Sequence, residues 1–202
     1  MKKKFATALL TLATALAFAD EQTLTQPTYG QNLPTEKKLA ISEKTSLNKS
    51  YTYLRMGVTD TYPTNSVQIV PGLGLGYRLS AGDGALDLSA NYTRGKGLTG
   101  EETSYFYTLP KATYLHYLAP TKGQSVYAGA GLAFGGMKNK EGTKFQGLIP
   151  SATVGYEMNR KTNFRSFVQL DVSQPAIAAN LTKAEGKGFP GPIAEISVGA
   201  GF

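Results

Sequence analysis

Apolar side chains recur at every second position over most of the chain beyond residue 50. In residues 67–79, valine, isoleucine, leucine and tyrosine alternate with glycine, glutamine and arginine. Successive side chains of a β-strand point to opposite faces, so this spacing predicts a strand with one apolar face. Eight such runs follow one another, bounded by residues that favour turns. They cover residues 53–59, 67–79, 86–93, 105–117, 126–134, 148–158, 164–172 and 194–202.

The fourth run, residues 105–117, alternates less cleanly than the others. A strict period of two places Leu115 and Tyr117 on the apolar face and His116 on the polar face. The same period leaves Lys111 among the apolar side chains, where a charge is not expected. On this interpretation His116 points into the interior.

The chemistry of the two faces separates a membrane barrel from a soluble β-structure. The minority face consists largely of glycine, serine, threonine, asparagine and paired charges, which cannot form a hydrophobic core. The apolar face is therefore predicted to contact lipid, with the sheet closed so that no strand edge is left in hydrocarbon. The predicted fold class is all-β: a closed antiparallel up-and-down transmembrane β-barrel of about eight strands over residues 51–202. A soluble periplasmic β-sandwich would have to expose a broad apolar face.

The connections between the runs give the predicted barrel a direction. Those on one side are short: residues 80–85, 119–124 and 159–163. Those on the other side are mostly longer: residues 60–66, 95–103, 135–144 and 174–192. Short turns face the periplasm and long loops face outward in outer-membrane barrels. Tyrosines gather toward the ends of the runs, which suits the two membrane interfaces.

The first 50 residues do not alternate. Residues 1–19 combine lysines at positions 2–4 with an apolar run of about 15 residues and end on small residues, Ala17 and Ala19. This pattern predicts a cleaved signal peptide, because the run is shorter than the roughly 20 residues a membrane-spanning helix needs. Residues 20–50 are polar and lack sustained periodicity, so they are predicted to be a flexible leader.

Composition removes several function classes. The chain has no cysteine, so disulfides, a thiol nucleophile and cysteine-based metal sites are excluded. Its one histidine, His116, lacks the accompanying ligands or triad partners that a metal or catalytic site needs. No catalytic residue, metal or cofactor is therefore expected, and the chain is not predicted to be an enzyme. The net charge of +7 is scattered along the chain, so nucleic-acid binding is not expected either.

Inward charges on neighbouring runs face one another when the hairpins fold about their short turns. Arg78 then lies across from Asp87, and Glu157 lies across from Arg165. Further charged or titratable side chains fall at about the same depth. We therefore predict one ionic network in the periplasmic half of the lumen, formed by Arg55, Arg78, Asp87, His116, Glu157 and Arg165.

This network has two possible roles. It can simply satisfy buried polar groups, or it can form the constriction of a gated pore. The first is favoured because an eight-stranded barrel is barely wider than its own side chains. Asp171 and Glu195 are expected toward the opposite end of the barrel, as a weaker acidic ring.

The end of the chain carries the most specific pattern. Outward-facing Ile196, Val198 and Ala200 lead to a terminal aromatic residue, Phe202. Over about residues 51–202 the chain resembles the small eight-stranded bacterial outer-membrane β-barrel proteins of the OmpX, OmpW and OmpA transmembrane-domain types. The resemblance implies an outer-membrane location, and it implies that these four residues are the assembly signal read by the barrel assembly machinery.

Taken together, these patterns predict an integral outer-membrane protein with a structural or surface-interaction role through its extracellular loops. The expected partners are outer-membrane lipid, lipopolysaccharide and the barrel assembly machinery. Loop lysines make the exposed surface basic, which suits anionic lipopolysaccharide or acidic glycans: Lys138, Lys140, Lys183 and Lys187. A narrow channel for ions or small solutes is the alternative function, and a soluble periplasmic β-sandwich binding protein is the third.

Overall fold

The computed structural model describes residues 47, 49–61, 69–96, 103–138, 142–182 and 190–202. All of them fall within one compact unit that begins at Glu36. The predicted signal peptide and most of the predicted leader lie outside the described residues. Of the residues that are described, none belongs to a helix long and apolar enough to span a membrane.

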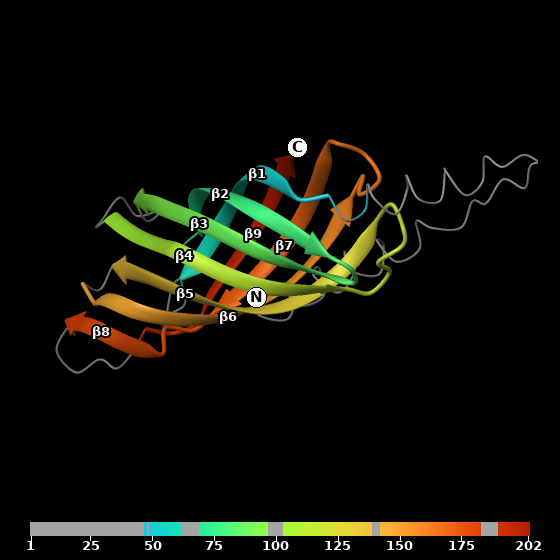
Figure 1. The fold of residues 1–202 in the computed structure, drawn as a ribbon. Helices are drawn as coiled ribbons and strands as arrows, with labels where there is room; N and C mark the ends of the chain where they lie inside the picture. The colour runs from blue at the N-terminus through green and yellow to red at the C-terminus, as the bar shows by residue number, and fades with distance from the viewer. Residues whose placement is uncertain (1–46, 48, 62–68, 97–102, 139–141, 183–189) are drawn as a thin grey trace, which may run out of the picture. The chain divides into compact units, whose positions relative to one another are not determined.

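Nine strands in the described part of the chain form one antiparallel sheet (Figure 1). They are β1 (Tyr51–Thr61), β2 (Ile69–Ala81), β3 (Gly84–Lys96), β4 (Thr103–Tyr117), β5 (Ser125–Lys138), β6 (Lys144–Met158), β7 (Arg165–Ser173), β8 (Ile177–Thr182) and β9 (Ile193–Gly201). Each of the eight predicted runs corresponds to one strand. The short strand β8 is additional and lies within the connection predicted between the last two runs.

The sheet closes on itself. Each of the strands β1 to β6 pairs with the next, β7 pairs with β9, and β9 pairs back with β1. β7 pairs with the C-terminal half of β6 and β8 pairs with its N-terminal half, so β7 and β8 together occupy one position in the wall. The predicted closed eight-stranded barrel is confirmed, and the alternative of a β-sandwich is wrong.

A proline explains the break between β7 and β8. Pro175 has no backbone N–H and cannot donate a hydrogen bond to the ladder. The residues on either side still donate across the break, Gln174 N to Pro150 O at 3.0 Å and Ala176 N to Leu148 O at 3.2 Å. The wall therefore continues past the interruption.

The two faces of the sheet have the polarity that the sequence predicted. On β1, Leu54 is 71% exposed and Met56 is 61% exposed, whereas the alternate residues Tyr53 and Arg55 are buried. The same alternation holds along β2, β3 and β9. The protein thus buries charged side chains and exposes leucines, which is the reverse of a soluble protein.

Glycines on the inward face make room for aromatic rings. At three of them a Cβ atom would collide with the ring of the residue directly opposite on the neighbouring strand. The pairs are Gly76 with Tyr53, Gly155 with Tyr127, and Gly199 with Phe167. A ring and a missing side chain together fill the narrow interior without widening the barrel.

β4 departs from a strict period of two. Its pairing with both neighbours shifts between Thr108 and Lys111, so β4 carries one extra residue at this point. The extra residue lies at Leu109 and Pro110, where the proline removes a donor from the ladder. This β-bulge reverses which residues of β4 face inward.

The bulge corrects the predicted orientation of the second half of β4. His116 is exposed on the outer face, so its predicted place inside the lumen is wrong. Leu115 and Tyr117 were predicted to face outward and instead lie inside, each only 1% exposed. Lys111, which did not fit the apolar face, is buried in the interior.

The corrected orientation can be tested by comparing two substitutions. We expect His116→Leu to change the free energy of unfolding by less than about 0.5 kcal/mol, because the side chain lies on the apolar outer face. We expect Lys111→Met to cost about 3 kcal/mol, because it leaves the buried Asp171 carboxylate, 2.6 Å from the ammonium, short of a partner. Urea unfolding in detergent micelles measures both changes. A larger loss of stability for His116→Leu than for Lys111→Met would mean that β4 follows a strict period of two, with His116 inside the barrel.

Candidate functional site

The interior of the barrel is filled with side chains in three layers. We call the end that carries the β2–β3, β4–β5 and β6–β7 turns the turn end, and the opposite end the loop end. A charged and aromatic layer lies at the turn end, an ionic layer lies in the middle, and an apolar layer lies at the loop end.

Arg78 is the centre of the turn-end layer and is completely buried. Its Nε donates to Asp87 Oδ2 at 2.8 Å and its Nη1 donates to Glu157 Oε2 at 2.9 Å. Its Nη2 donates to Gln169 Oε1 at 3.2 Å. One guanidinium thus joins β2, β3, β6 and β7 across the lumen.

Aromatic side chains enclose this guanidinium. Four rings lie with their centroids 4.6 to 5.8 Å from its central carbon: Tyr51, Tyr53, Tyr127 and Phe167. Three tyrosine hydroxyls donate to the acceptors that Arg78 also contacts: Tyr53 to Asp87 at 2.7 Å, Tyr117 to Glu157 at 2.5 Å and Tyr127 to Gln169 at 2.7 Å. The charged groups are therefore surrounded by aromatic rings, and the hydroxyls of Tyr53, Tyr117 and Tyr127 are hydrogen-bonded within the same layer.

Glu157 gathers further cations at the turn end. Its Oε1 lies 3.4 Å from Arg165 Nη1 and 3.9 Å from Arg160 Nε. Arg160 belongs to the β6–β7 turn, and its guanidinium lies over the Tyr117 ring at 3.9 Å. Its Nη1 also donates to backbone carbonyls of the β4–β5 turn, including Pro120 O at 3.1 Å. Burial lowers the pKa of Arg160, an effect that Tyr117 and Glu157 oppose.

The last described residues of the leader lie against the same end of the barrel. Arg165 Nη2 donates to Leu47 O at 3.5 Å, and Ser80 Oγ donates to Lys49 O at 3.3 Å. The Lys49 ammonium donates to Asn163 Oδ1 at 2.9 Å. The segment that leads into β1 therefore contacts the β6–β7 turn and the turn-end residues of β2 and β7.

Asp171 is the centre of the middle layer. Lys111 Nζ lies 2.6 Å from its Oδ1, and Arg55 Nη1 lies 3.1 Å from its Oδ2. Gln169 Nε2 also donates to Asp171 Oδ2 at 2.8 Å. Because Gln169 accepts from Arg78 as well, the middle and turn-end layers form one connected network. Arg55 further approaches Glu195 at 3.6 Å.

The loop-end layer is apolar. Its buried members come from β4, β5, β6 and β9: Phe106, Ala133, Met137, Phe145, Ile149 and Ile193. Ala178 and Leu181 of β8 pack against them. This small core lies between the ionic layers and the loop end of the barrel.

The structure brings together most of the residues predicted to form the lumen network. Arg78, Asp87, Glu157 and Arg165 meet in the turn-end layer. Arg55, predicted at the same depth, lies in the middle layer instead. His116 is outside the barrel wall and takes no part.

Other members of the network were not predicted from the sequence. Asp171 and Glu195 were expected as a weak acidic ring near the loop end, but both contact Arg55 in the middle layer. Lys111 was assigned to the wrong face because the bulge was not recognised, although a lysine among apolar residues was a visible signal of it. No pattern in the sequence indicated that Arg160 is buried, because its burial depends on two turns that are distant in sequence.

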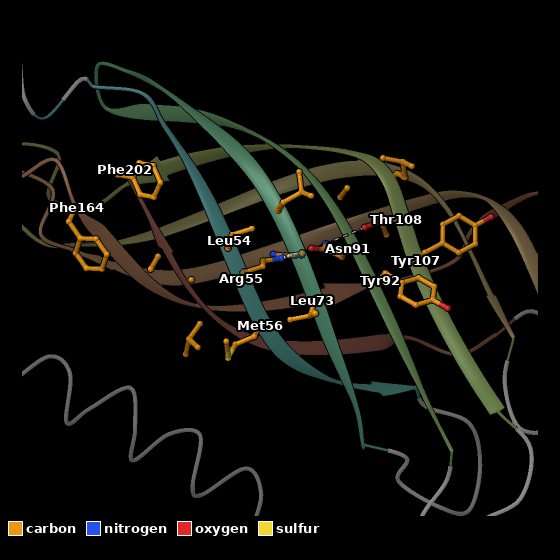
Figure 2. A pocket seen from close by; sticks show the side chains of 17 residues that line it. Leu54, Arg55, Met56, Leu73, Asn91, Tyr92, Tyr107, Thr108, Phe164 and Phe202 are labelled. Carbon is orange, nitrogen blue, oxygen red and sulfur yellow. Dashed lines mark hydrogen bonds between the residues drawn. The ribbon is translucent and has the colours of Figure 1, made fainter.

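The outer face of β1, β2, β3, β4 and β9 carries an apolar groove (Figure 2). Outward side chains line most of it, among them Leu54, Met56, Leu73, Tyr92, Tyr107 and Phe202. Arg55, Asn91 and Thr108 border it from within, linked by hydrogen bonds in which Arg55 Nε donates to Asn91 Oδ1 and Asn91 Nδ2 donates to Thr108 Oγ1. Among the described residues, no group of three or more histidine and acidic side chains could hold a metal ion.

The turn-end layer predicts a large effect from removing its central charge. We expect Arg78→Met to lower the free energy of unfolding by about 3–5 kcal/mol, because the Asp87 and Glu157 carboxylates remain buried with fewer partners. Lys161→Met, in the exposed β6–β7 turn, is the matched control and should change stability by less than about 0.5 kcal/mol. Urea unfolding in micelles measures both. Equal effects would mean that the network contributes nothing specific.

Comparison with known proteins gives a match in fold but not in sequence. No family model and no curated protein sequence matches the chain. Neisserial surface protein A, from Neisseria, superposes with a TM-score of 0.59 at 9% identity, covering 75% of this chain and 95% of that protein. The attachment invasion locus protein Ail of Yersinia pestis gives 0.50 at 14% identity, covering 75% and 95%. The chain therefore has the fold of the small eight-stranded outer-membrane β-barrel proteins.

Proposed function

We propose that this chain is an integral outer-membrane protein with a sealed lumen, and that its role is structural or surface-interacting rather than enzymatic. The observation that carries the proposal is the polarity of the closed sheet, which exposes apolar side chains and buries ionic ones. Hydrocarbon is the solvent that suits such an outer face. The fold shared with outer-membrane barrels supports the same location.

The height of the apolar band supports a membrane-spanning wall. On β6, outward apolar residues extend from Leu148 to Met158. At about 3.3 Å per residue this is roughly 33 Å along the strand, or about 25 Å along the axis of a barrel whose strands tilt by about 40°. That is about the height of the apolar band in outer-membrane barrels.

The polarity of the two faces reverses at the loop end, which supports a membrane boundary there. Nearer the turn end of β5, Leu132 faces outward and the small residue Gly131 faces inward. At the end of β5, apolar Met137 faces inward and Lys138 faces outward. β6 repeats the change with Phe145 inside. Inward apolar and outward charged side chains are the arrangement found in proteins surrounded by water. We infer that the strands leave the hydrocarbon layer at this level.

A sealed lumen is favoured over the alternative of a narrow channel. The charges that would line a channel are paired with one another across the lumen, and rings fill the space around Arg78. The apolar loop-end layer adds a second barrier, because ions would have to cross it without water.

In this proposal the turn end lies in the periplasm and the loop end lies outside the cell, because short turns face the periplasm in outer-membrane barrels. Contacts with other molecules then belong to the loop end. The predicted assembly signal lies on the lipid-facing side of β9, where Ile196, Val198 and Phe202 are 40, 50 and 85% exposed and Ala200 is also exposed. That exposure suits recognition by the barrel assembly machinery.

Gel mobility of membrane-extracted protein tests the location and the assembly signal. We expect the unheated protein to migrate faster than the boiled protein, and we expect deletion of Phe202 to reduce the folded fraction in the outer membrane severalfold. Phe164→Ala is the matched control, because it removes another exposed aromatic side chain at the turn end and should leave assembly intact. Identical mobility with recovery from the soluble periplasm would overturn the proposal.

Conductance in planar bilayers tests the sealed lumen. We expect the wild-type protein to give no current steps above the baseline, because paired charges and apolar side chains fill the lumen. Insertion is verified in the same samples by the mobility shift. Regular current steps from inserted wild-type protein would replace the sealed barrel with a channel.

A further inference from the structure

The wall of the barrel closes at a seam between its first and last strands. β9 pairs with β1 along its whole length. Two backbone hydrogen bonds add a last rung at the turn end, Phe202 N to Thr52 O at 3.0 Å and Thr52 N to Phe202 O at 3.3 Å. The other neighbouring positions of the wall are joined by turns or longer connections. At the seam, hydrogen bonds alone join the two strands.

The residues that lead into β1 reach across this seam. We call Leu47 and Lys49 the strap. The Lys49 carbonyl accepts from Ser80 Oγ of β2 at 3.3 Å, and the Leu47 carbonyl accepts from Arg165 Nη2 of β7 at 3.5 Å. The strand order in the wall is β7, β9, β1, β2. The strap therefore contacts the strands on both sides of the seam.

The Lys49 side chain adds a second contact beyond the seam. Its ammonium donates to Asn163 Oδ1 in the β6–β7 turn at 2.9 Å. Hydrogen bonds from an ionised donor are stronger than those between neutral groups. Leu47 is only 8% exposed, although it precedes the first strand. The strap is thus held by its backbone and by a charged side chain.

One end of the strap is joined to the interior of the barrel. The Arg165 guanidinium, which donates to the Leu47 carbonyl, lies 3.4 Å from Glu157 Oε1. It also lies 5.0 Å from the centroid of the Tyr51 ring. Tyr51 is the first residue of β1 and Arg165 is the first residue of β7. The strap is therefore anchored to the turn-end layer and not to a surface side chain.

Two of the three hydrogen bonds of the strap require a closed wall. If the seam opened, β1 would become one edge of the sheet and β9 the other. The strap would stay with β1 and could keep its contact with Ser80 on β2. Its contacts with Arg165 and Asn163 would break, because both lie on the side of β9.

We propose that the strap is a clamp on the seam, which slows the opening of the barrel between β1 and β9 at the turn end. The clamp goes beyond the proposed function, because it concerns how the barrel stays closed and is independent of what the loops contact. It gives the residues before β1 a role in the barrel that the pairing of the wall strands does not supply.

The rate at which the folded gel band disappears in urea and detergent micelles at a fixed temperature measures this opening. We expect Lys49→Met and Asn163→Ala each to raise the rate about fivefold, because each removes the same hydrogen bond across the seam. The double variant should also show a rise of about fivefold, since the two side chains act through each other. An unchanged rate in the single variants would overturn the clamp, and so would a double variant in which the two effects multiply.

The matched control is Thr121→Ala, which truncates an exposed side chain in the β4–β5 turn. It should open at the wild-type rate. A rise equal to that of Asn163→Ala would mean that any truncation in a turn loosens the barrel, and the clamp would be refuted.

A cross-link tests the clamp without weakening it. The chain has no cysteine, so the Lys49→Cys, Asn163→Cys variant can be joined specifically by a short bismaleimide. We expect efficient linkage in the folded protein, and we expect the linked barrel to open severalfold more slowly than the same variant left unlinked. Lys49→Cys combined with Lys144→Cys, at the loop end, should not be linked. A linked barrel that opens as fast as the unlinked one would refute the clamp.

The failure of this inference can be told apart from failure of the proposed function. If the chain gives no heat-sensitive folded band, the membrane barrel itself is refuted, and the clamp with it. If the band forms and the variants open as the wild type does, only the clamp is refuted.

Discussion

The width of an eight-stranded barrel is the constraint on which the rest of this structure depends. Such an interior is just wide enough for side chains to meet across it, so each inward residue must suit the residues opposite. This explains why a glycine stands directly across from Tyr53, Tyr127 and Phe167, where any Cβ would collide with a ring. It also explains why the inward charges cannot be solvated individually and must be neutralised by one another.

The pairing that results is a single network and not a set of separate ion pairs. Arg78 contacts two carboxylates, Glu157 receives three arginines, and Asp171 receives a lysine and an arginine. Removing one member of such a network leaves its partners without a counter-charge. A buried charge without a counter-charge lowers the free energy of unfolding by several kcal/mol. In the proposed sealed barrel, the sealing of the lumen is then a consequence of satisfying these groups. A gate would need a second arrangement in which the same charges were again paired.

Much of the fold could be predicted because a closed sheet between lipid and a polar interior imposes a period of two on every strand. The period failed in β4, where Pro110 lies in a bulge and reverses the side chains that follow. Counting the period alone could not locate the bulge, although a lysine at position 111 on the predicted apolar face indicated that the period was broken there. The place of Arg160 was beyond sequence reasoning, since its partners are carbonyls of another turn. β8 was taken for loop because Pro175 interrupts the wall strand that it continues.

The reversal of polarity along β5 and β6 separates the part of the molecule that maintains the barrel from the part that can meet other molecules. On the turn-end side of the reversal, the inward ionic network and the outward apolar wall each depend on the other. Neither face can therefore change without affecting the other. Above it, Met137 and Phe145 form a small core of the soluble kind, and Lys138 and Lys144 face outward. Such a core resembles that of a soluble protein, so lipid is not needed to cover it. In the proposed function, contacts with other molecules therefore belong to this part of the barrel, where they leave the ionic network nearer the turn end undisturbed.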